Sequence, residues 1–336
     1  MNRTEIKDMQ RKVRVYGTLG PSCKDADTLK RMIEEGMSGI RLNLSHTTLE
    51  DASELIKAYH NAARACGVNS ELLIDMQGPE LRIGALIEPL MLKEGDLIEA
   101  QMLELPKEVK AALFTAPHGS NILLDDGKLL LMKEEGELLR VVRGGILESR
   151  KSVAIPGADI KTPAMTESDM LNIEKAKEYG VSAVMQPFVR GKDDLLTVRS
   201  ALSAAGCESA RLLAKIENFE GIAALPDIIP YCDEIVIARG DLGNAMKLWE
   251  LPAAQKRIAE ACRKAGRDFM VVTQMLDSMM HRAVPTRAEV SDIFNAVLDG
   301  ASSVMVTGET ASGEYPVQAI RFLAKTVREA KLFLAQ

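Results

Sequence analysis

The sequence predicts an α/β fold, a closed (β/α)8 TIM barrel with a small all-β domain inserted after the third strand. Three observations predict it: short apolar runs alternate with longer helical patterns, eight such units can be traced, and the alternation is interrupted once. The apolar runs lack the in-and-out alternation of half-exposed strands, so they indicate parallel strands buried on both faces. Eight β–α units fit a closed barrel better than an open sheet.

Three units precede the interruption and five follow it. The expected strands are Arg11–Thr18, Gly39–Asn43, Glu71–Met76, Ser182–Gln186, Arg211–Ile216, Glu234–Ala238, Asp268–Thr273 and Ser302–Val306. The expected helices are Asp27–Glu35, Leu49–Cys66, Ser168–Tyr179, Lys192–Ala205, a short one from Asn218, Leu251–Ala265, Arg287–Leu298 and Pro316–Phe333. The sequence stops after this last helix, so we expect no further domain and no regulatory tail.

The interruption runs from about Ile83 to Pro156 and is rich in glycine and charge. It contains three β-like pieces, GDLIEAQML, SNILLDDGKLLLM and GELLRVVRGGIL. Asp125–Gly127 lies between two apolar runs and predicts a hairpin turn. We therefore expect residues 1–82 and 157–336 to form the barrel and residues 83–156 to form a β-rich lid domain.

Composition narrows the class of protein. The net charge of −6 argues against nucleic acid as a partner, because that binding needs a basic face. Five dispersed cysteines without a C-x-x-C pair indicate reduced thiols. The polar N-terminus lacks a signal-peptide core, and no apolar run approaches the roughly 20 residues of a membrane span. We expect a soluble cytoplasmic protein with no membrane contact.

Almost every expected strand ends in a polar or charged group. In a (β/α)8 barrel these ends meet at one mouth, where active sites lie. The residues are Thr18, Arg41, Asn43, Ser45, Asp75, Gln186, Lys215, Glu217, Arg239, Asp241, Thr273, Gln274, Gly308 and Glu309. Together they predict a charged cavity able to hold a metal ion. The alternative is that each residue caps a helix or a turn.

The segment LLAKIENFEG carries the strongest local pattern. Lys215 and Glu217 are two residues apart, so they share one face of an extended strand. The pair suits a buried salt bridge, or a phosphate-binding lysine beside a metal-binding glutamate, and both interpretations stay open. In EIVIARGDLG, Gly240 permits a tight turn whose backbone could hold an anion, and Asp241 could join Glu217 on Mg²⁺. An ordinary turn is the alternative.

The remaining motifs are less specific. Thr273 ends a strand, and Thr286 with Glu289 predicts a capping box at a helix start. Asp292 and Asn295 on that helix fit a solvated face equally well. Gly308 in VTGETASGEYP could leave backbone donors open to a phosphate, or could belong to a plain loop. His46 is the only histidine at a strand end, and the chain has no P-loop and no HExxH motif. Phosphoryl transfer would therefore depend on Lys, Arg and a metal ion.

Taken in order, the motifs resemble the pyruvate kinase family: TLGPS, GIRLNLSH, LLIDMQGPELRIG, AKIENFEG, IARGDLG, TQMLDSM, PTRAE and NAVLDGA…GETASGEYP. The resemblance covers nearly the whole chain. It implies a barrel with a β-rich lid after the third strand, and the glycolytic transfer of phosphate from phosphoenolpyruvate to ADP, giving pyruvate and ATP. It implies the cofactors Mg²⁺ (or Mn²⁺) and K⁺, and a homodimer through the barrel. The family's usual C-terminal domain has no counterpart here, so we expect no allosteric activation through it.

The resemblance also implies roles for single residues. Lys215 corresponds to the lysine that contacts the transferring phosphoryl group, Arg41 and Arg82 to arginines near the phosphate, and Thr273 to the threonine near the protonated face of the enolate. Gly240 and Asp241 are expected to contact the substrate. The other expected roles are Mg²⁺ ligation by Glu217 and Asp241, K⁺ ligation by Asn43, Ser45, Asp75 and the Met76 carbonyl, and nucleotide contacts by His46 and Lys151.

Some positions depart from the family pattern. Lys24 stands where the family often has Arg, Ser312 where it often has Lys, and Phe219 where it usually has His. Glu80 matches the form associated with K⁺ dependence. These changes bear on the nucleotide more than on phosphoenolpyruvate. Two alternative functions remain: a metal-dependent lyase or decarboxylase acting on a 2-oxo acid, and a non-catalytic regulatory relative.

Overall fold

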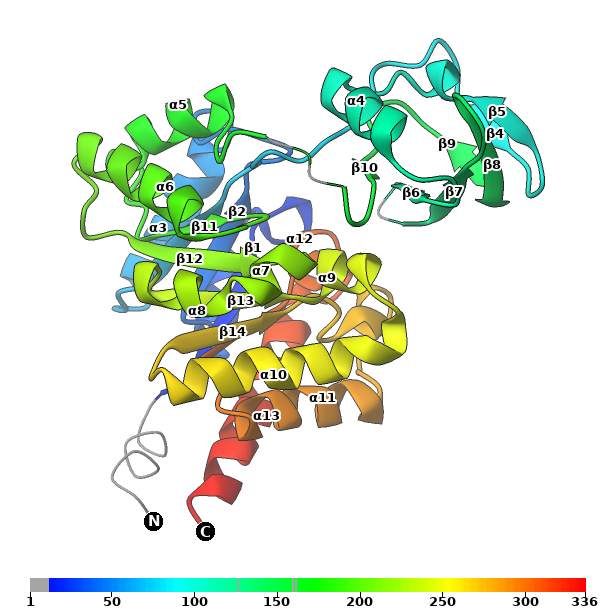
Figure 1. Cartoon of the computed structure of the whole chain (residues 1–336). Coiled ribbons are helices and arrows are strands. Elements are labelled where there is room, and N and C mark those ends of the chain that lie inside the picture. The colour runs from blue at the N-terminus through cyan, green and yellow to red at the C-terminus, as the bar shows by residue number, and fades with distance from the viewer. Residues whose placement is uncertain (1–11, 126, 159, 161) are drawn as a thin grey trace. The chain divides into compact units, whose positions relative to one another are not determined.

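The computed structural model describes residues 12–125, 127–158, 160 and 162–336. It divides into two compact units, Met1–Gly78 with Ala164–Gln336, and Pro79–Pro163 (Figure 1). The expected lid, 83–156, falls inside the second unit. Arg11 of the first expected strand and Asp126 of the expected hairpin turn lie outside the described residues.

The first unit is a closed barrel of eight parallel strands, which confirms the predicted fold class. In chain order the strands are β1 (Arg14–Thr18), β2 (Gly39–Asn43), β3 (Glu71–Asp75), β11 (Ala183–Gln186), β12 (Arg211–Ile216), β13 (Glu234–Ala238), β14 (Asp268–Val272) and β15 (Ser303–Met305). Each strand pairs in parallel with its neighbours in sequence, and β1 closes the ring by pairing with β15.

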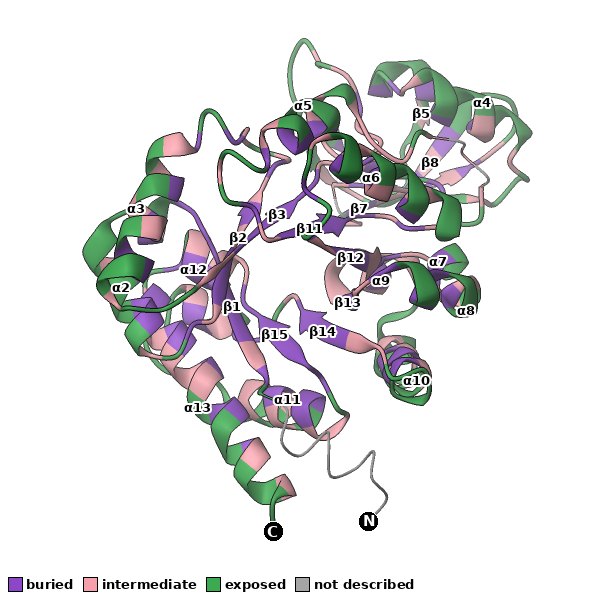
Figure 2. Cartoon of the chain, turned by 90° about the vertical axis from the view of Figure 1, so that its left-hand side faces the viewer, coloured by how far each residue is buried: buried purple, intermediate pink, exposed green. Residues whose placement is uncertain are grey.

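Helices surround the strands and bury one side against them (Figure 2). They are α2 (Ala26–Glu34), α3 (Ser53–Ala65), α5 (Glu167–Lys175), α6 (Lys192–Ala204), α7 (Phe219–Ala223), α8 (Leu225–Ile228), α9 (Arg239–Ala245), α10 (Leu251–Lys264), α11 (Arg287–Leu298), α12 (Gly308–Ala311) and α13 (Pro316–Leu334). Short 3-10 turns are η1 (Pro21–Cys23), η3 (Ile229–Tyr231), η4 (Leu248–Glu250) and η5 (Asp277–Met280).

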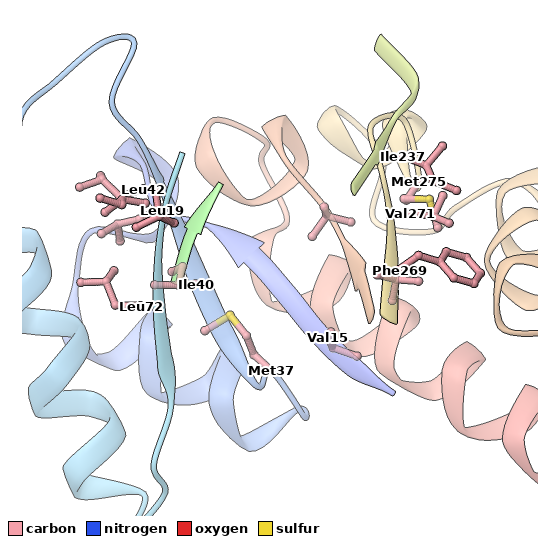
Figure 3. Close-up of a cluster of buried hydrophobic side chains, with 14 of the residues drawn as sticks. Val15, Leu19, Met37, Ile40, Leu42, Leu72, Ile237, Phe269, Val271 and Met275 are labelled. Carbon is pink, nitrogen blue, oxygen red and sulfur yellow. The ribbon is translucent and has the colours of Figure 1, made fainter. Parts of the chain in front are cut away.

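Two layers of core follow from the alternation of side chains along each strand. Outward residues such as Ile40, Leu72, Ile237 and Val271 pack against the helices (Figure 3). Inward residues fill the barrel itself: Tyr16, Leu73, Ala183, Met185, Leu213, Val236, Ala238, Met270, Val272 and Met305. The interior is therefore a packed core, and chemistry is confined to the barrel's ends.

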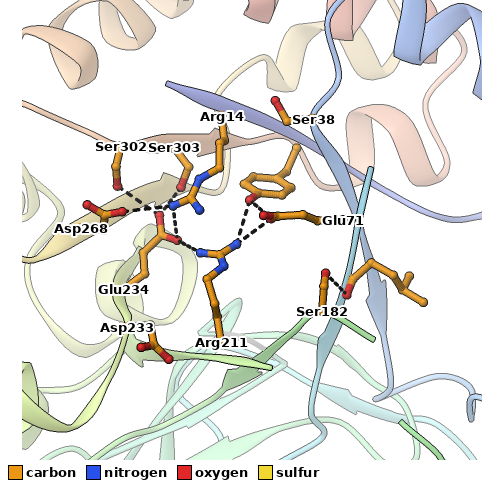
Figure 4. Close-up of polar contacts among 12 residues, drawn as sticks. Arg14, Ser38, Glu71, Ser182, Arg211, Asp233, Glu234, Asp268, Ser302 and Ser303 are labelled. Atoms are coloured by element: carbon orange, nitrogen blue, oxygen red, sulfur yellow. Dashed lines mark hydrogen bonds and ion pairs between the residues drawn. The ribbon is translucent and has the colours of Figure 1, made fainter. Parts of the chain in front are cut away.

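A charged network closes the N-terminal end of the barrel (Figure 4). Glu234, fully buried, accepts hydrogen bonds from Arg14 Nη2 at 2.9 Å, from Arg211 Nη1 at 2.8 Å and from the hydroxyl of Ser303. These four residues are the first residues of their strands, so they form a ring at that end. Arg211 Nη2 also donates to Glu71 at 2.6 Å. Sequence reasoning did not predict this network, which lies away from the strand ends where barrel enzymes do chemistry.

The second unit has its own hydrophobic core and two small antiparallel sheets. Strands β10, β6, β7, β8 and β5 form one sheet, and β4 with β9 forms the other. Their bounds are β4 (Leu90–Leu92), β5 (Leu97–Glu99), β6 (Asn121–Leu124), β7 (Leu129–Lys133), β8 (Leu138–Arg143), β9 (Gly145–Leu147) and β10 (Val153–Ala154), with the 3-10 turn η2 (Ala100–Leu103) between β5 and α4 (Lys107–Thr115).

Helix α4 shows that the expectation of an all-β insertion was wrong. Val109 and Leu113, four residues apart, lie on one face of α4 and are buried in the unit's core. Lys133 Nζ donates to the carbonyl oxygens of Leu113 at 2.6 Å and Ala116 at 2.7 Å, which satisfies the free carbonyls at the end of the helix. The helix thus depends on a residue that follows it by many positions, a contact that the local pattern does not reveal.

Candidate active site

Charged side chains at the C-terminal end of the barrel form one cluster around Lys215. Its Nζ lies 3.2 Å and 3.3 Å from the two carboxylate oxygens of Asp75, and 3.0 Å from Glu217 Oε1. Arg41 shares the same aspartate, with Nε 2.8 Å and Nη2 2.7 Å from Asp75 Oδ2. Two cations and two carboxylates therefore lie within ion-pair distance of one another.

Strand geometry explains why these residues converge. Leu73 and Leu213 line the barrel interior, and a residue two positions further along a strand keeps the same direction. Asp75 and Lys215 therefore point inward as well, one layer nearer the mouth. Asn43 on β2 is in register with Asp75 on β3, which brings a third expected site residue to the same level.

Mutual charges set the protonation of the cluster. Burial alone would lower the pKa of Lys215, but Asp75 and Glu217 outweigh it and raise that pKa well above its usual value. Burial alone would raise the pKa of Asp75, but Lys215 and Arg41 hold it below its usual value. Lys215 therefore stays protonated and positively charged, and Asp75 stays ionised and negatively charged.

Glu217 behaves differently from Asp75. Burial raises the pKa of Glu217 to about 7, and the charges of Asp241 and Asp75 add to that effect, while Lys215 opposes it. Asp241 also acts on the pKa of Lys215, so Lys215, Glu217 and Asp241 share one electrostatic environment. A cation placed beside Glu217 would favour its ionised form.

The carboxylates fit a hard divalent ion. Glu217 Oε2 accepts a hydrogen bond from the Phe188 backbone N–H at 2.8 Å. The buried Oε1 accepts no hydrogen bond among the described residues, although Lys215 lies close to it. Within that same part of the chain, no three His, Cys, Asp or Glu side chains are placed to hold a metal ion. Mg²⁺ rarely needs three, since one or two carboxylates with substrate oxygens and waters suffice.

Backbone conformation at two strand ends is unusual. Phe188 follows β11 with φ +51°, and Thr273 and Gln274 follow β14 with φ +80° and +54°. Non-glycine residues adopt this left-handed region at a cost of order 1–3 kcal/mol each, and such strain gathers at functional sites. The N–H of Phe188 reaches Glu217 in this conformation, so its strain helps to orient a carboxylate.

The segment around Asp241 is a helix and not the tight turn that was expected. Residues Arg239–Ala245 form α9, so Gly240 and Asp241 lie in its first turn. Arg239 donates from Nε and Nη2 to the Thr273 carbonyl at 3.1 Å and 2.7 Å, and its Nη1 lies 2.6 Å from Asp292 Oδ2. Asp292 therefore pairs with a largely buried arginine, although the sequence fitted a solvated helix face equally well.

Other expected site residues are placed as follows. Asn43 Oδ1 accepts a hydrogen bond from the Ser45 backbone N–H at 3.2 Å, just after β2. Met76 is buried beside Asp75, and His46 is exposed. Arg82 and Lys151 belong to the second unit. There Arg82 Nη2 lies 2.6 Å from Glu80, and Lys151 Nζ lies 3.2 Å from Asp125.

The chain matches the family model described as "Pyruvate kinase, barrel domain" over residues 10–320. The chain belongs to the pyruvate kinase family. It is 36% identical to the pyruvate kinase of Geobacillus stearothermophilus over 93% of this chain and 56% of that enzyme. The enzyme of Aeropyrum pernix is 35% identical over 97% of this chain and 72% of that enzyme, and that of Corynebacterium glutamicum 36% identical over 96% and 70%.

Family membership confirms the resemblance seen in the motifs. The chain spans between 56% and 72% of the length of these pyruvate kinases. Two of the positions that depart from the family pattern, Lys24 and Ser312, are exposed, and Phe219 is 53% exposed at the start of α7. None of the described helices is long and apolar enough to cross a membrane.

Proposed function

We propose that this chain transfers a phosphoryl group from phosphoenolpyruvate to ADP, giving pyruvate and ATP. The observation that carries the proposal is the Lys215, Arg41, Asp75 and Glu217 cluster at the C-terminal end of a pyruvate kinase barrel. Phosphoryl transfer requires little covalent chemistry from a protein and depends on positive charge held where negative charge develops. A lysine kept charged by two carboxylates meets that requirement.

The proposed roles combine this cluster of charges with the roles that the family resemblance implies. Lys215 and Arg41 hold the phosphoryl oxygens, and Gly240 with Asp241 contacts the rest of the substrate. Glu217 and Asp241 would hold Mg²⁺ (or Mn²⁺), which when bound neutralises charge on the phosphate. Asn43, Ser45, Asp75 and the Met76 carbonyl would hold K⁺. By the resemblance, Arg82 corresponds to a second arginine near the phosphate, and His46 and Lys151 correspond to nucleotide contacts.

The reaction also requires a proton. As the bond from phosphorus to the enol oxygen breaks, the phosphoryl group passes to a terminal oxygen of ADP, and the enolate of pyruvate remains. Its methylene carbon takes a proton from the Thr273 hydroxyl, and the threonine oxygen takes one from water. Thr273 is half-buried, and its hydroxyl makes no hydrogen bond within the part of the chain that the structure describes, so it is free to face a ligand.

An ATP-forming assay with phosphoenolpyruvate, ADP, Mg²⁺ and K⁺ tests the proposal. We expect ATP and pyruvate to form in equal amounts. No ATP, with turnover of oxaloacetate, would contradict the proposal and favour the lyase or decarboxylase. Ligand binding without any turnover would favour the regulatory relative.

The cellular setting is part of the proposal. Work in the cytoplasm is supported by five cysteines that are all free thiols, four of them buried. A homodimer through the barrel stays a prediction, which analytical ultracentrifugation tests.

A further inference from the structure

Arg239 has no role in the mechanism above, yet its side chain is only 12% exposed and lies at the edge of the site. Its guanidinium donates to the carbonyl oxygens of Thr273, at 2.7 Å and 3.1 Å, and of Gln274, at 3.4 Å. Asp292, from helix α11, holds the guanidinium at 2.6 Å. The arginine thus links two carbonyls of one short segment to a carboxylate on a separate element.

That segment has a backbone conformation that its residues do not favour. Thr273 and Gln274 have φ values of +80° and +54°, and threonine is β-branched, which makes the left-handed region especially unfavourable for it. Such a conformation persists only where surrounding contacts hold it. The paired donors of Arg239 supply those contacts, because a guanidinium presents several N–H groups in a rigid plane.

We propose that Arg239, held by Asp292, is a positioning residue that fixes the Thr273–Gln274 turn and thereby aims the Thr273 hydroxyl. The inference rests on the proposed function, because it concerns the proton that the enolate receives. Arg239 acts through Thr273 and touches neither substrate nor nucleotide in this account.

A second contact limits the position of the Thr273 side chain, and it comes from Gly240, the residue after Arg239. A Cβ added to Gly240 would lie 3.2 Å from Thr273 Cγ2, so the α9 backbone packs directly on that side chain. Arg239 holds the backbone of Thr273 while Gly240 limits its side chain. Both constraints come from the first turn of α9, which makes the start of this helix a support for Thr273.

The test separates proton transfer from binding. Arg239→Met is compared with wild type for kcat and KM for phosphoenolpyruvate, and for exchange of the pyruvate methyl hydrogens in D₂O with Mg²⁺ and ATP, followed by NMR. Misplacing a reacting group by about 1 Å can reduce a rate on the order of 100-fold. We expect kcat and the exchange rate to fall together by about 10- to 100-fold, with KM changed less than about threefold.

Two further variants keep the test decisive. Arg199→Met is the matched control, because Arg199 likewise pairs with a carboxylate, Asp233 at 2.8 Å, and a carbonyl, Ala210 at 3.1 Å. It should leave kcat and exchange within about twofold of wild type. If Arg239→Met does not fold, Asp292→Asn tests the proposal instead. We expect this variant to lose less kcat and less exchange rate than Arg239→Met would, with an unchanged KM.

The outcomes are distinguishable. Kinetic changes in Arg239→Met no larger than those in Arg199→Met, or unchanged kcat in Asp292→Asn, would overturn the positioning role. A loss confined to KM would also overturn it. A wild-type chain that makes no ATP would instead refute the proposed function.

Discussion

At the residue scale, the candidate active site depends on Asp75 as much as on Lys215. The i and i+2 spacing of Lys215 and Glu217 predicted that they share one face, and Lys215 Nζ lies 3.0 Å from Glu217 Oε1. The spacing could not show that Asp75, from another strand, binds both Lys215 and Arg41, because that contact depends on barrel closure. For the same reason, nothing in the sequence indicated that Arg239 and Asp292, 53 positions apart, form a pair.

Activation by K⁺ is the first residue-scale prediction. Asn43, Ser45 and Asp75 motivate it as expected ligands, and Glu80 as the residue form associated with K⁺ dependence, because a bound K⁺ would add positive charge where negative charge develops. The rate of ATP formation should be higher in K⁺ than in Na⁺ at the same ionic strength. Equal initial rates in the two salts, with all other components matched, would show that the expected K⁺ site is not used.

At the element scale, the barrel strands were predictable and the ends of elements less so. Gly39–Asn43, Arg211–Ile216 and Glu234–Ala238 have the predicted bounds, because each is a short apolar run between turn residues. Strand β14 ends at Val272, one residue before its predicted end, since Thr273 turns into the left-handed region. The α4 helix was missed because tertiary contacts, including Lys133, stabilise it.

The capping box at α11 is confirmed and has a further partner. Glu289 accepts from the Thr286 backbone N–H at 2.7 Å, and also from the Ser278 N–H at 2.7 Å, which ties η5 to the helix. Burial alone would raise the pKa of Glu289, but the hydrogen bonds from Ser278 and Thr286 outweigh it and lower that pKa. The carboxylate therefore stabilises the folded state only while it is ionised.

Glu289→Gln should reduce the free energy of unfolding by about 1 kcal/mol near pH 7. Because the folded-state pKa is lowered, the difference from wild type is fully present above the usual glutamate pKa. It is lost as the pH falls through the folded-state value. Urea unfolding of both proteins, from about pH 7 to below pH 4, measures this difference in the free energy of unfolding. The exposed Asn295→Gln on the same helix serves as control, and a difference that grows toward acid pH would contradict the account.

At the scale of the whole molecule, the two separate hydrophobic cores predict that each unit unfolds locally without the other. The core of Pro79–Pro163 includes Val109, Leu113 and Leu131, and it shares no residues with the cores of the barrel. The sequence predicted this division because the β–α alternation breaks and then resumes. It could not define where the second unit begins, since the boundary depends on contacts and not on composition.

Lys133→Met tests the independence of the second unit. Lys133 is buried and donates to three carbonyls at the end of α4, at 2.6, 3.2 and 2.7 Å. Leaving these carbonyls unsatisfied should cost about 1–3 kcal/mol. Hydrogen exchange should speed up by roughly tenfold or more in α4 and its sheet, while the barrel strands keep their protection. Equal loss of protection in both units would contradict separate cores.

The central claim is that Lys215, held charged by Asp75 and Glu217, stabilises a migrating phosphoryl group. The most direct measurement is the initial rate of ATP formation by Lys215→Met, beside wild type and the exposed control Lys256→Met, with circular dichroism to verify folding. If this claim holds, folded Lys215→Met loses on the order of 100-fold or more in kcat, while Lys256→Met matches wild type. A folded Lys215→Met that forms ATP at a near-normal rate would contradict it.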